Sequence, residues 1–511
     1  MNMIPIISIN NRHKRNLQLL LLVATILNTA CIKEMNFFKE KEESNNKEEE
    51  KDDKGSFYLY PFDKEILNAS TSLLIRTNKP IDVTLIQAEI PVLKYNKQWL
   101  LMLTQDDCLQ STYCRTWAAI NGKPIASSQL YPDPTDSDPD RMIDYYYHAA
   151  QLQKGDLPPT IIPAGKSLGS TDGTGKEVRF AITAAIWPEK DMMTQKVTVT
   201  PGFTDNNNYR FYRGASLVWD DVSEMLNYGS GISFHDVEAE NVQDPASILE
   251  HFTIAQTIIQ DNLSGRGCKT LAEPNGNKTY IEAANQYVPI QTMVAQTEAD
   301  DIYPFKVIND LHKVVHNRYF NDDPSEFKQM ILKEIKNFPP KARRGIHIGV
   351  HNTDNNWVEL LSWVNNTYGK DGDDSVWFPS FEEYYEYNYY RIHGTIMVEQ
   401  IDLNTLKLTV NLPSEQYFYY PSITVNLFGI PLENVASIET DNVITGFSYT
   451  NFENGLMMNI DCRKYLVEHA EKFIERYEKD QSNQSNKADA IYYVDMLKDS
   501  DTKTNLLNRL K

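Results

Sequence analysis

The 511-residue sequence is poor in cysteine, with only five, which excludes a small domain held together by a dense disulfide framework. The cysteines also lack the paired C-x2-C spacing of a zinc knuckle. No long run of lysine or arginine follows residue 16, and the net charge is -20, so the electrostatic field repels nucleic acid.

Cys108 and Cys114 are close enough in sequence to form a disulfide in an oxidising compartment. Connectivity does not follow from spacing alone, and buried free thiols fit the same sequence equally well. The sequence leaves both alternatives open for this pair.

The N-terminal segment resembles a bacterial lipoprotein signal peptide. Basic residues up to Arg15 precede the apolar stretch Leu17 to Leu27, which is too short to span a bilayer, and the following Asn-Thr-Ala-Cys places Cys31 at the cleavage site. The resemblance implies a protein in the bacterial cell envelope, periplasmic or surface-exposed, with lipidated Cys31 anchoring it to a membrane. The alternative is an ordinary signal peptide before an incidental cysteine, which also predicts export.

Residues 32–55 are expected to be a flexible tether that follows the signal peptide of residues 1–31. The stretch Lys39 to Lys54 has eight acidic and five basic residues and almost no apolar side chain. It cannot bury enough surface to offset the entropy of ordering. The chain as a whole, with 41% hydrophobic residues, is long enough for two or three domains.

Two adjacent carboxylates, Asp106 and Asp107, come just after an apolar run that begins at Trp99. A continuous hydrophobic run is typical of a strand buried in a parallel sheet, and the carboxyl ends of such strands carry the catalytic groups of α/β enzymes. The pair therefore predicts a functional site. The alternative is structural, with both carboxylates capping the helix that follows.

The remaining pattern predicts an α/β domain followed by a β-sandwich. Short β-prone pieces make residues 56–96 a strand-rich lead-in. In residues 97–391 apolar strands alternate with helical periods, which predicts parallel βα units in a barrel or a doubly wound sheet. Residues 392–462 alternate as in an antiparallel sandwich, and residues 463–511 have helical periodicity.

Two segments show helical signals that bear on the site. Asp244 and Pro245 form an N-cap and first-turn pair and predict that a helix begins there. His312 and His316 are four residues apart, a spacing that can bring two imidazoles to one metal on a helix. Lys313 stands where that motif has glutamate, so we interpret the pair as solvated helix surface.

Three further motifs follow the two carboxylates in chain order. A short strand ends at His235, the turn Pro274-Asn275-Gly276 comes next, and another strand ends at His351. The order strand-Asp-Asp, strand-His, Pro-x-Gly, strand-His resembles the polysaccharide deacetylase family (NodB-like, carbohydrate esterase family 4) over about residues 98–391. The resemblance implies a distorted (β/α) barrel of that type, to which the C-terminal antiparallel β-sandwich is attached.

The resemblance also implies a site that removes acetyl groups from a carbohydrate with a divalent metal, expected to be zinc. Asp106 would be the general base and His351 the general acid. Asp107 and His235 would be metal ligands. His347, four residues before His351, faces the same way on the strand but is expected to be a buried core residue.

The chain departs from the family pattern at two positions. The place of the second histidine ligand is taken by Ala239, so the adjacent carboxylate Glu238 is the candidate for a third metal ligand. The arginine that orients the base in the family is replaced by Ala272. The turn Pro274-Asn275-Gly276 is retained, and its glycine allows the backbone to approach a bound substrate.

Two functions fit this sequence. One is an exported, membrane-tethered, metal-dependent deacetylase that acts on an acetylated poly- or oligosaccharide. The other is a metal-poor, catalytically inactive lipoprotein that uses the same barrel to bind glycans. Ala239 and Ala272 favour the binding protein, whereas the retained carboxylates and imidazoles favour the enzyme.

Overall fold

The computed structural model describes residues 68–126, 165–194, 216–236 and 244–511, together with five two-residue strands between these ranges. The chain divides into two units, residues 1–55 and residues 56–511. The predicted signal peptide, the tether and Cys31 lie outside the described residues, and so does Glu238.

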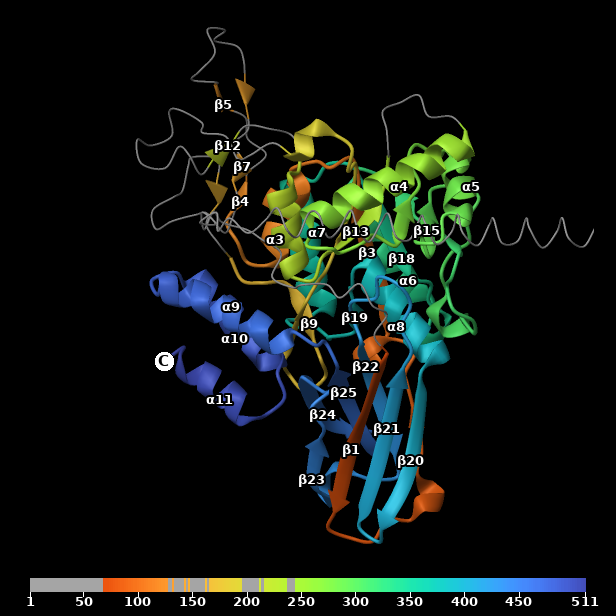
Figure 1. Cartoon of the computed structure of the whole chain (residues 1–511), viewed down its shortest axis with the longest axis vertical. Helices are drawn as coiled ribbons and strands as arrows, with labels where there is room; N and C mark the ends of the chain where they lie inside the picture. Colours follow the sequence, from red (N-terminus) through yellow and green to blue (C-terminus); the bar gives the residue numbers. More distant parts are fainter. Residues whose placement is uncertain are drawn as a thin grey trace, which may run out of the picture. The chain divides into compact units, whose positions relative to one another are not determined.

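A parallel sheet forms the centre of the α/β part (Figure 1). In spatial order its strands are β16 (Val315–Asn317), β15 (Thr292–Ala295), β14 (Thr270–Ala272), β13 (Gly231–Phe234), β11 (Thr183–Ile186), β3 (Trp99–Gln105), β18 (Ile346–Val350) and β17 (Tyr319–Phe320). A further strand, β19 (Val376–Trp377), pairs with β3. Only Arg318 separates β16 from β17, the two ends of this order. The strands thus form a nearly closed barrel, which confirms the predicted fold.

Alternation along β3 gives the barrel an inner and an outer face. Leu101 and Leu103 belong to the apolar cluster that includes the surrounding helices. Leu100 and Met102 belong to a second cluster, which continues from the barrel interior into the sandwich. Because side chains of a strand alternate between its two faces, Asp106 follows Leu100 and Met102 on the inner face.

Helices cover the outside of the barrel (Figure 1). They are α3 (Trp219–Asn227), α4 (Pro245–Asn262), α5 (Lys278–Gln286), α6 (Pro324–Asn337) and α7 (Asn355–Tyr368), with the short α2 (Ala118–Ile120) and a π-helix, η3 (Thr112–Trp117). The Asp244 carboxylate accepts hydrogen bonds from the first backbone N–H groups of α4, which confirms the predicted helix start. A further helix, α8 (Phe381–His393), lies at the amino end of the barrel, where the Phe381 N–H donates to the Thr183 hydroxyl at the start of β11.

The sandwich consists of two antiparallel four-stranded sheets, as predicted. One sheet has the order β20 (Thr395–Asp402), β21 (Thr405–Leu412), β1 (Ala69–Thr77) and β23 (Val435–Thr440). The other has the order β2 (Gln87–Glu89), β22 (Ser422–Phe428), β25 (Gly455–Asp461) and β24 (Gly446–Phe452). Two strands of the predicted lead-in, β1 and β2, therefore complete sheets whose other strands lie more than 300 residues later.

Three C-terminal helices pack against the barrel: α9 (Leu466–Lys479), α10 (Gln484–Met496) and α11 (Asp501–Asn508). Phe473 of α9 meets Tyr228 with ring centroids 5.1 Å apart. The remaining strands form two-stranded pairs: β9 (Gly169–Thr171) with β10 (Glu177–Arg179), β4 (Ile125–Ala126) with β8 (Ile161–Ile162), β5 (Tyr131–Pro132) with β6 (Met142–Ile143), and β7 (Tyr146–Tyr147) with β12 (Phe211–Tyr212). Within the described ranges, no helix has the length and apolar character needed to cross a bilayer.

The prediction that His312 and His316 share an exposed helix face is wrong. His316 lies in β16 and is only 3% exposed, whereas His312 lies in the turn before that strand. The β-branched pair Val314 and Val315 between them favours an extended backbone. Burial lowers the pKa of His316 to about 3, so this imidazole remains neutral inside the barrel.

All four cysteines that the structure describes are free and buried, including Cys108 and Cys114. Burial raises the pKa of Cys108 to about 12, and reactivity requires the thiolate. In a Cys31→Ser variant we therefore expect no thiol to react with Ellman's reagent until guanidinium unfolds the protein, and then four. Rapid labelling of the native protein, or only two thiols after unfolding, would contradict this expectation.

Candidate active site

The two adjacent carboxylates lie at the carboxyl end of β3, the strand between β11 and β18. The Asp106 N–H donates to the Val350 carbonyl at 2.9 Å, which continues the ladder between β3 and β18. Its side chain is 1% exposed. The next residue, Asp107, has a φ of 66°, a left-handed conformation that turns the chain out of the strand. Its side chain is 33% exposed, so one carboxylate is buried and the other reaches the surface.

His235 follows β13 and contacts both carboxylates. Its Nδ1 donates to the Ala272 carbonyl at 2.9 Å, which leaves Nε2 facing Asp107 Oδ1 at 3.3 Å and Asp106 Oδ2 at 3.7 Å. Burial opposes protonation of His235, but the neighbouring carboxylates outweigh it, and its pKa is raised. Because Nδ1 is used by a carbonyl, a positive charge between Nε2 and the carboxylates, a proton or a metal ion, stabilises this arrangement.

His351 approaches the outer carboxylate from the other side. It follows β18, and its Nε2 is 3.7 Å from Asp107 Oδ2. Its Nδ1 is 3.7 Å from Asp322 Oδ2, and its ring meets Phe320 edge to face at 4.4 Å. The side chain is 42% exposed, so it can reach a molecule at the barrel rim. The hydrogen bond to His235 lowers the pKa of Asp107, which thus stays ionised between two imidazoles.

Four of the predicted site residues therefore come together at one end of the barrel: Asp106, Asp107, His235 and His351. They arrive from three strands that are neither consecutive nor close in sequence. His347 lies below them as the predicted core residue, 1% exposed, with Nε2 2.7 Å from the Thr104 hydroxyl.

The turn Pro274-Asn275-Gly276 follows β14, the strand next to β13. Asn275 and Gly276 have φ values of 52° and 70°, and no heavy atom lies within 4 Å of a Cβ built on Gly276. The backbone is therefore open to an approaching molecule, as the sequence predicts for this turn. Among the described contacts, none joins the side chains of this turn to the carboxylates or imidazoles of the site.

A buried arginine that sequence reasoning missed completes the site. Arg318, between β16 and β17, places Nη1 2.6 Å from Asp106 Oδ1, with no part of its side chain exposed. Its Nη2 donates to the Glu273 carbonyl at 3.3 Å. The signal in the sequence was a lone arginine inside the β-prone segment 314–320, because an arginine within a buried strand needs a carboxylate partner.

Trp187 is a second neighbour that the sequence did not indicate. It follows β11 and stacks on His235, with ring planes 13° apart and centroids 6.3 Å apart. The Lys190 ammonium lies 3.9 Å from the centroid of the indole. Together with the hydrogen bond to the Ala272 carbonyl, this contact fixes the orientation of the His235 ring.

The described residues supply part of a metal centre. Within the described ranges, no three His, Cys, Asp or Glu side chains cluster closely enough to hold an ion. Asp107 and His235 fit as two ligands, since Nε2 faces the carboxylate and Nδ1 is bound to a carbonyl, the outer partner typical of metal-bound histidine. The third ligand predicted from the sequence, Glu238, lies in residues 237–243, outside the described residues.

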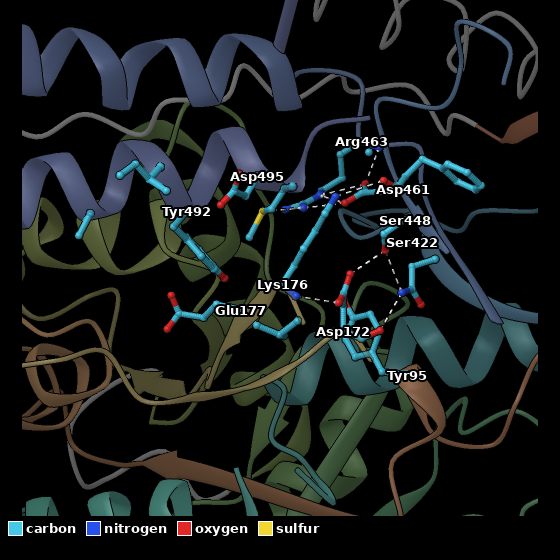
Figure 2. Close-up of a pocket in the computed structure, with 17 residues that line it drawn as sticks. Tyr95, Asp172, Lys176, Glu177, Ser422, Ser448, Asp461, Arg463, Tyr492 and Asp495 are labelled. Carbon is cyan, nitrogen blue, oxygen red and sulfur yellow. Dashed lines mark hydrogen bonds and ion pairs between the residues drawn. The ribbon is translucent and has the colours of Figure 1, made fainter. Parts of the chain in front are cut away.

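Two cavities among the described residues lie away from this site. Figure 2 shows one of about 160 Å³, in which the Asp172 carboxylate accepts from the Ser448 hydroxyl at 2.6 Å and Asp461 pairs with Arg463 at 2.6 Å. The other, of about 710 Å³, includes Gly229 at the amino end of the barrel. Neither is lined by the carboxylates or imidazoles of the site, so both are separate from it.

Comparison with known proteins adds one finding. A family model described as "Putative polysaccharide deacetylase" matches residues 71–511, a range that covers both the barrel and the sandwich. None of the curated proteins matches the chain.

Proposed function

Because the chain belongs to this polysaccharide deacetylase family, we propose that it is a metal-dependent deacetylase that removes acetyl groups from a carbohydrate. One observation carries the proposal: a buried carboxylate, an exposed carboxylate and two imidazoles from three separate strands meet at the carboxyl end of the barrel. Active sites of such barrels lie at this end. The fold alone would not support turnover.

Deacetylation requires a base for the attacking water and an acid for the leaving group. In the proposed mechanism Asp106 takes the proton from the water, because it is buried, fixed by Arg318 and aimed into the site. His351 protonates the leaving amine or alkoxide, because it is the most exposed of the four groups. Asp107 contacts His235 through Oδ1 and His351 through Oδ2, and His235 also faces Asp106, so the proposed base and acid belong to one continuous group of side chains.

Asp107 and His235 would hold a divalent ion, with Glu238 as the proposed third ligand. When bound, zinc or a similar ion supplies Lewis-acid polarisation of the acetyl carbonyl. His235 is prepared for this by its hydrogen bond to the Ala272 carbonyl and its stacking on Trp187.

The proposal includes the cellular setting implied by the N-terminal sequence. Export, lipidation of Cys31 and cleavage just before it, which removes residues 1–30, would anchor the protein to a membrane, and residues 32–55 would space the barrel from it. The substrate would then be an acetylated glycan of the cell envelope or its surroundings.

A second candidate function is glycan binding without turnover. It is favoured by one observation: the described residues supply two metal ligands rather than three. Metal content and acetate release separate the two functions.

We expect purified protein to contain close to one zinc or other divalent ion per chain and to release acetate from a panel of N-acetylglucosamine oligomers and O-acetylated xylo-oligosaccharides. Asp107→Ala removes a proposed ligand and is expected to abolish both metal binding and acetate release. Chelation of the wild type should abolish acetate release until the metal is restored. Asp261→Ala, at an exposed position in α4, is the matched control and should change neither. Folded wild-type protein with background metal and no acetate release on any substrate would favour the binding protein.

A further inference from the structure

We propose that Arg318 performs the base-orienting role of the arginine that position 272 lacks, and that the small side chain of Ala272 makes room for it. That Asp106 acts as a base is part of the proposed function, and the inference rests on it. The pairing of Arg318 with Asp106 follows from the geometry alone. If Arg318 has this role, the alanine at position 272 no longer argues against catalysis.

The first step is the ion pair itself. Arg318 Nη1 lies 2.6 Å from Asp106 Oδ1, and the two side chains are 0% and 1% exposed. A buried charge without a partner is strongly unfavourable, so each group requires the other. Asp106 Oδ2 remains directed toward His235 at 3.7 Å. The arginine therefore occupies one carboxylate oxygen and leaves the other for chemistry.

The second step is that the guanidinium is held at two points. Nη2 donates to the Glu273 carbonyl at 3.3 Å, and the guanidinium carbon lies 5.3 Å from the centroid of the Phe320 ring. A planar group fixed at two nitrogens cannot rotate freely. Arg318 thus sets the orientation of the Asp106 carboxylate as well as balancing its charge.

The third step concerns position 272. Ala272 ends β14 within the inner apolar cluster, directly before Glu273, whose carbonyl receives Arg318. The Arg318 guanidinium thus lies beside the backbone segment that would carry an arginine side chain at position 272. Two guanidinium groups on one buried carboxylate would repel each other. Arginine is therefore expected at either 272 or 318, but not at both.

The strand order explains how the replacement is possible. β16 and β17 close the barrel, pairing with β15 on one side and β18 on the other. Arg318 stands at the break between them. Inward alternation from His316, which contacts Phe381 inside the barrel, places residue 318 on the inner face as well.

The test is a set of four proteins assayed for acetate release on the N-acetylglucosamine oligomer or acetylated xylo-oligosaccharide that the wild type cleaves fastest. Arg318→Ala should lower kcat by about 100-fold, since misplacing a reacting group costs this much, with KM changed by less than about threefold, because Arg318 contacts Asp106 rather than the substrate. Arg318→Lys retains the charge, and its kcat should lie between those of the wild type and Arg318→Ala. Ala272→Arg alone should also lose activity. The double variant Ala272→Arg/Arg318→Ala should have a kcat about tenfold higher than that of Arg318→Ala.

The matched control is Arg344→Ala, because Arg344 is ion-paired with Glu334 and Asp301 near β17 but does not contact Asp106. It should leave kcat within about twofold of the wild type. An Arg318→Ala enzyme as active as this control, or a double variant no better than Arg318→Ala, overturns the inference.

Thermal unfolding of Arg318→Ala, Asp106→Asn and their combination tests the pair without any assay of turnover. Residues in contact give non-additive effects, and independent residues give additive ones. The pairing is supported if the unfolding temperature of the double variant falls by less than the sum of the two single-variant decreases. This holds even if the protein releases no acetate and the proposed function fails. Additive losses overturn the pairing, whatever the activity.

Discussion

The Asp106→Asn variant is expected to release acetate about 10³-fold more slowly than the wild type, within the range that general-base catalysis contributes. The amide keeps the shape of the carboxylate and an oxygen that can accept the hydrogen bond from Arg318, which is 2.6 Å long in the wild type. It cannot accept the proton of an attacking water. We therefore expect kcat to fall with little change in KM, measured by acetate release from acetylated oligosaccharides.

The same substitution leaves the Arg318 charge buried without a carboxylate, at a cost of roughly 3 kcal/mol in unfolding free energy. Activity must therefore be measured well below the unfolding midpoint of the variant, with circular dichroism confirming the native fold. Asp261→Asn, on the exposed surface of α4, is the control for a lost carboxylate. If Asp106→Asn keeps more than about a tenth of the wild-type rate, the base is another group.

Local sequence patterns were sufficient to place the carboxylates and imidazoles of the site. The apolar run before Asp106 is typical of a buried strand, and a parallel sheet brings the carboxyl ends of its strands to one edge. His235 and His351 end two further strands of the same kind. Because all three strands are parallel, the residues after them had to converge.

Contacts between distant parts of the chain could not be predicted in this way. Arg318 is 212 residues from Asp106, and its neighbours gave no reason to aim it at that carboxylate. The same limit applies to β1, which pairs with β21 and β23 at a separation of more than 300 residues. A β-prone segment indicates a strand, but its partners depend on which sheet edge is free once the rest has folded.

The wrong prediction for His316 has a different cause: the same residue spacing is compatible with a helix and with a strand. A four-residue interval brings side chains together on a helix, and it also puts them on one face of a strand. The choice between these depends on the residues in between, and Val314 and Val315 favour the strand. The structure places His316 in β16, inside the barrel.

A buried cluster of four charged side chains at the amino end of the barrel leads to the second large expected effect. Arg266 and Lys269 precede β14, and Glu382 and Glu386 lie one turn apart on α8. Arg266 Nη2 is 2.6 Å from Glu382 Oε2, and Lys269 Nζ is 2.7 Å from Glu386 Oε1, with all four side chains 0% exposed. Glu386 also accepts the backbone N–H groups of Tyr419 and Tyr420 in the sandwich loop. The cluster therefore joins the barrel, α8 and the sandwich.

Glu382→Gln is expected to lower the unfolding free energy by about 3–5 kcal/mol, the usual cost of leaving a buried charge unpaired. Burial opposes ionisation of Glu382, but Arg266 and Lys269 outweigh it, so its pKa is lowered and the native side chain is charged. Guanidinium denaturation monitored by circular dichroism measures the loss. The control is Glu475→Gln, which breaks a 3.0 Å pair with Lys472 whose side chains are 40% and 45% exposed. It should cost less than about 1 kcal/mol.

Replacing both Glu382 and Arg266 by methionine separates charge from packing. The double variant removes one anion and one cation and leaves Lys269 beside Glu386, so no uncompensated charge remains in the cluster. Replacing a buried ion pair by apolar side chains of similar volume is often close to neutral, and we therefore expect the double variant to be more stable than Glu382→Gln alone. If both variants lose the same amount, the stabilisation comes from shape and hydrogen bonds rather than from balanced charge. Because the cluster lies at the opposite end of the barrel from Asp106, acetate release per folded molecule should be unchanged in the double variant.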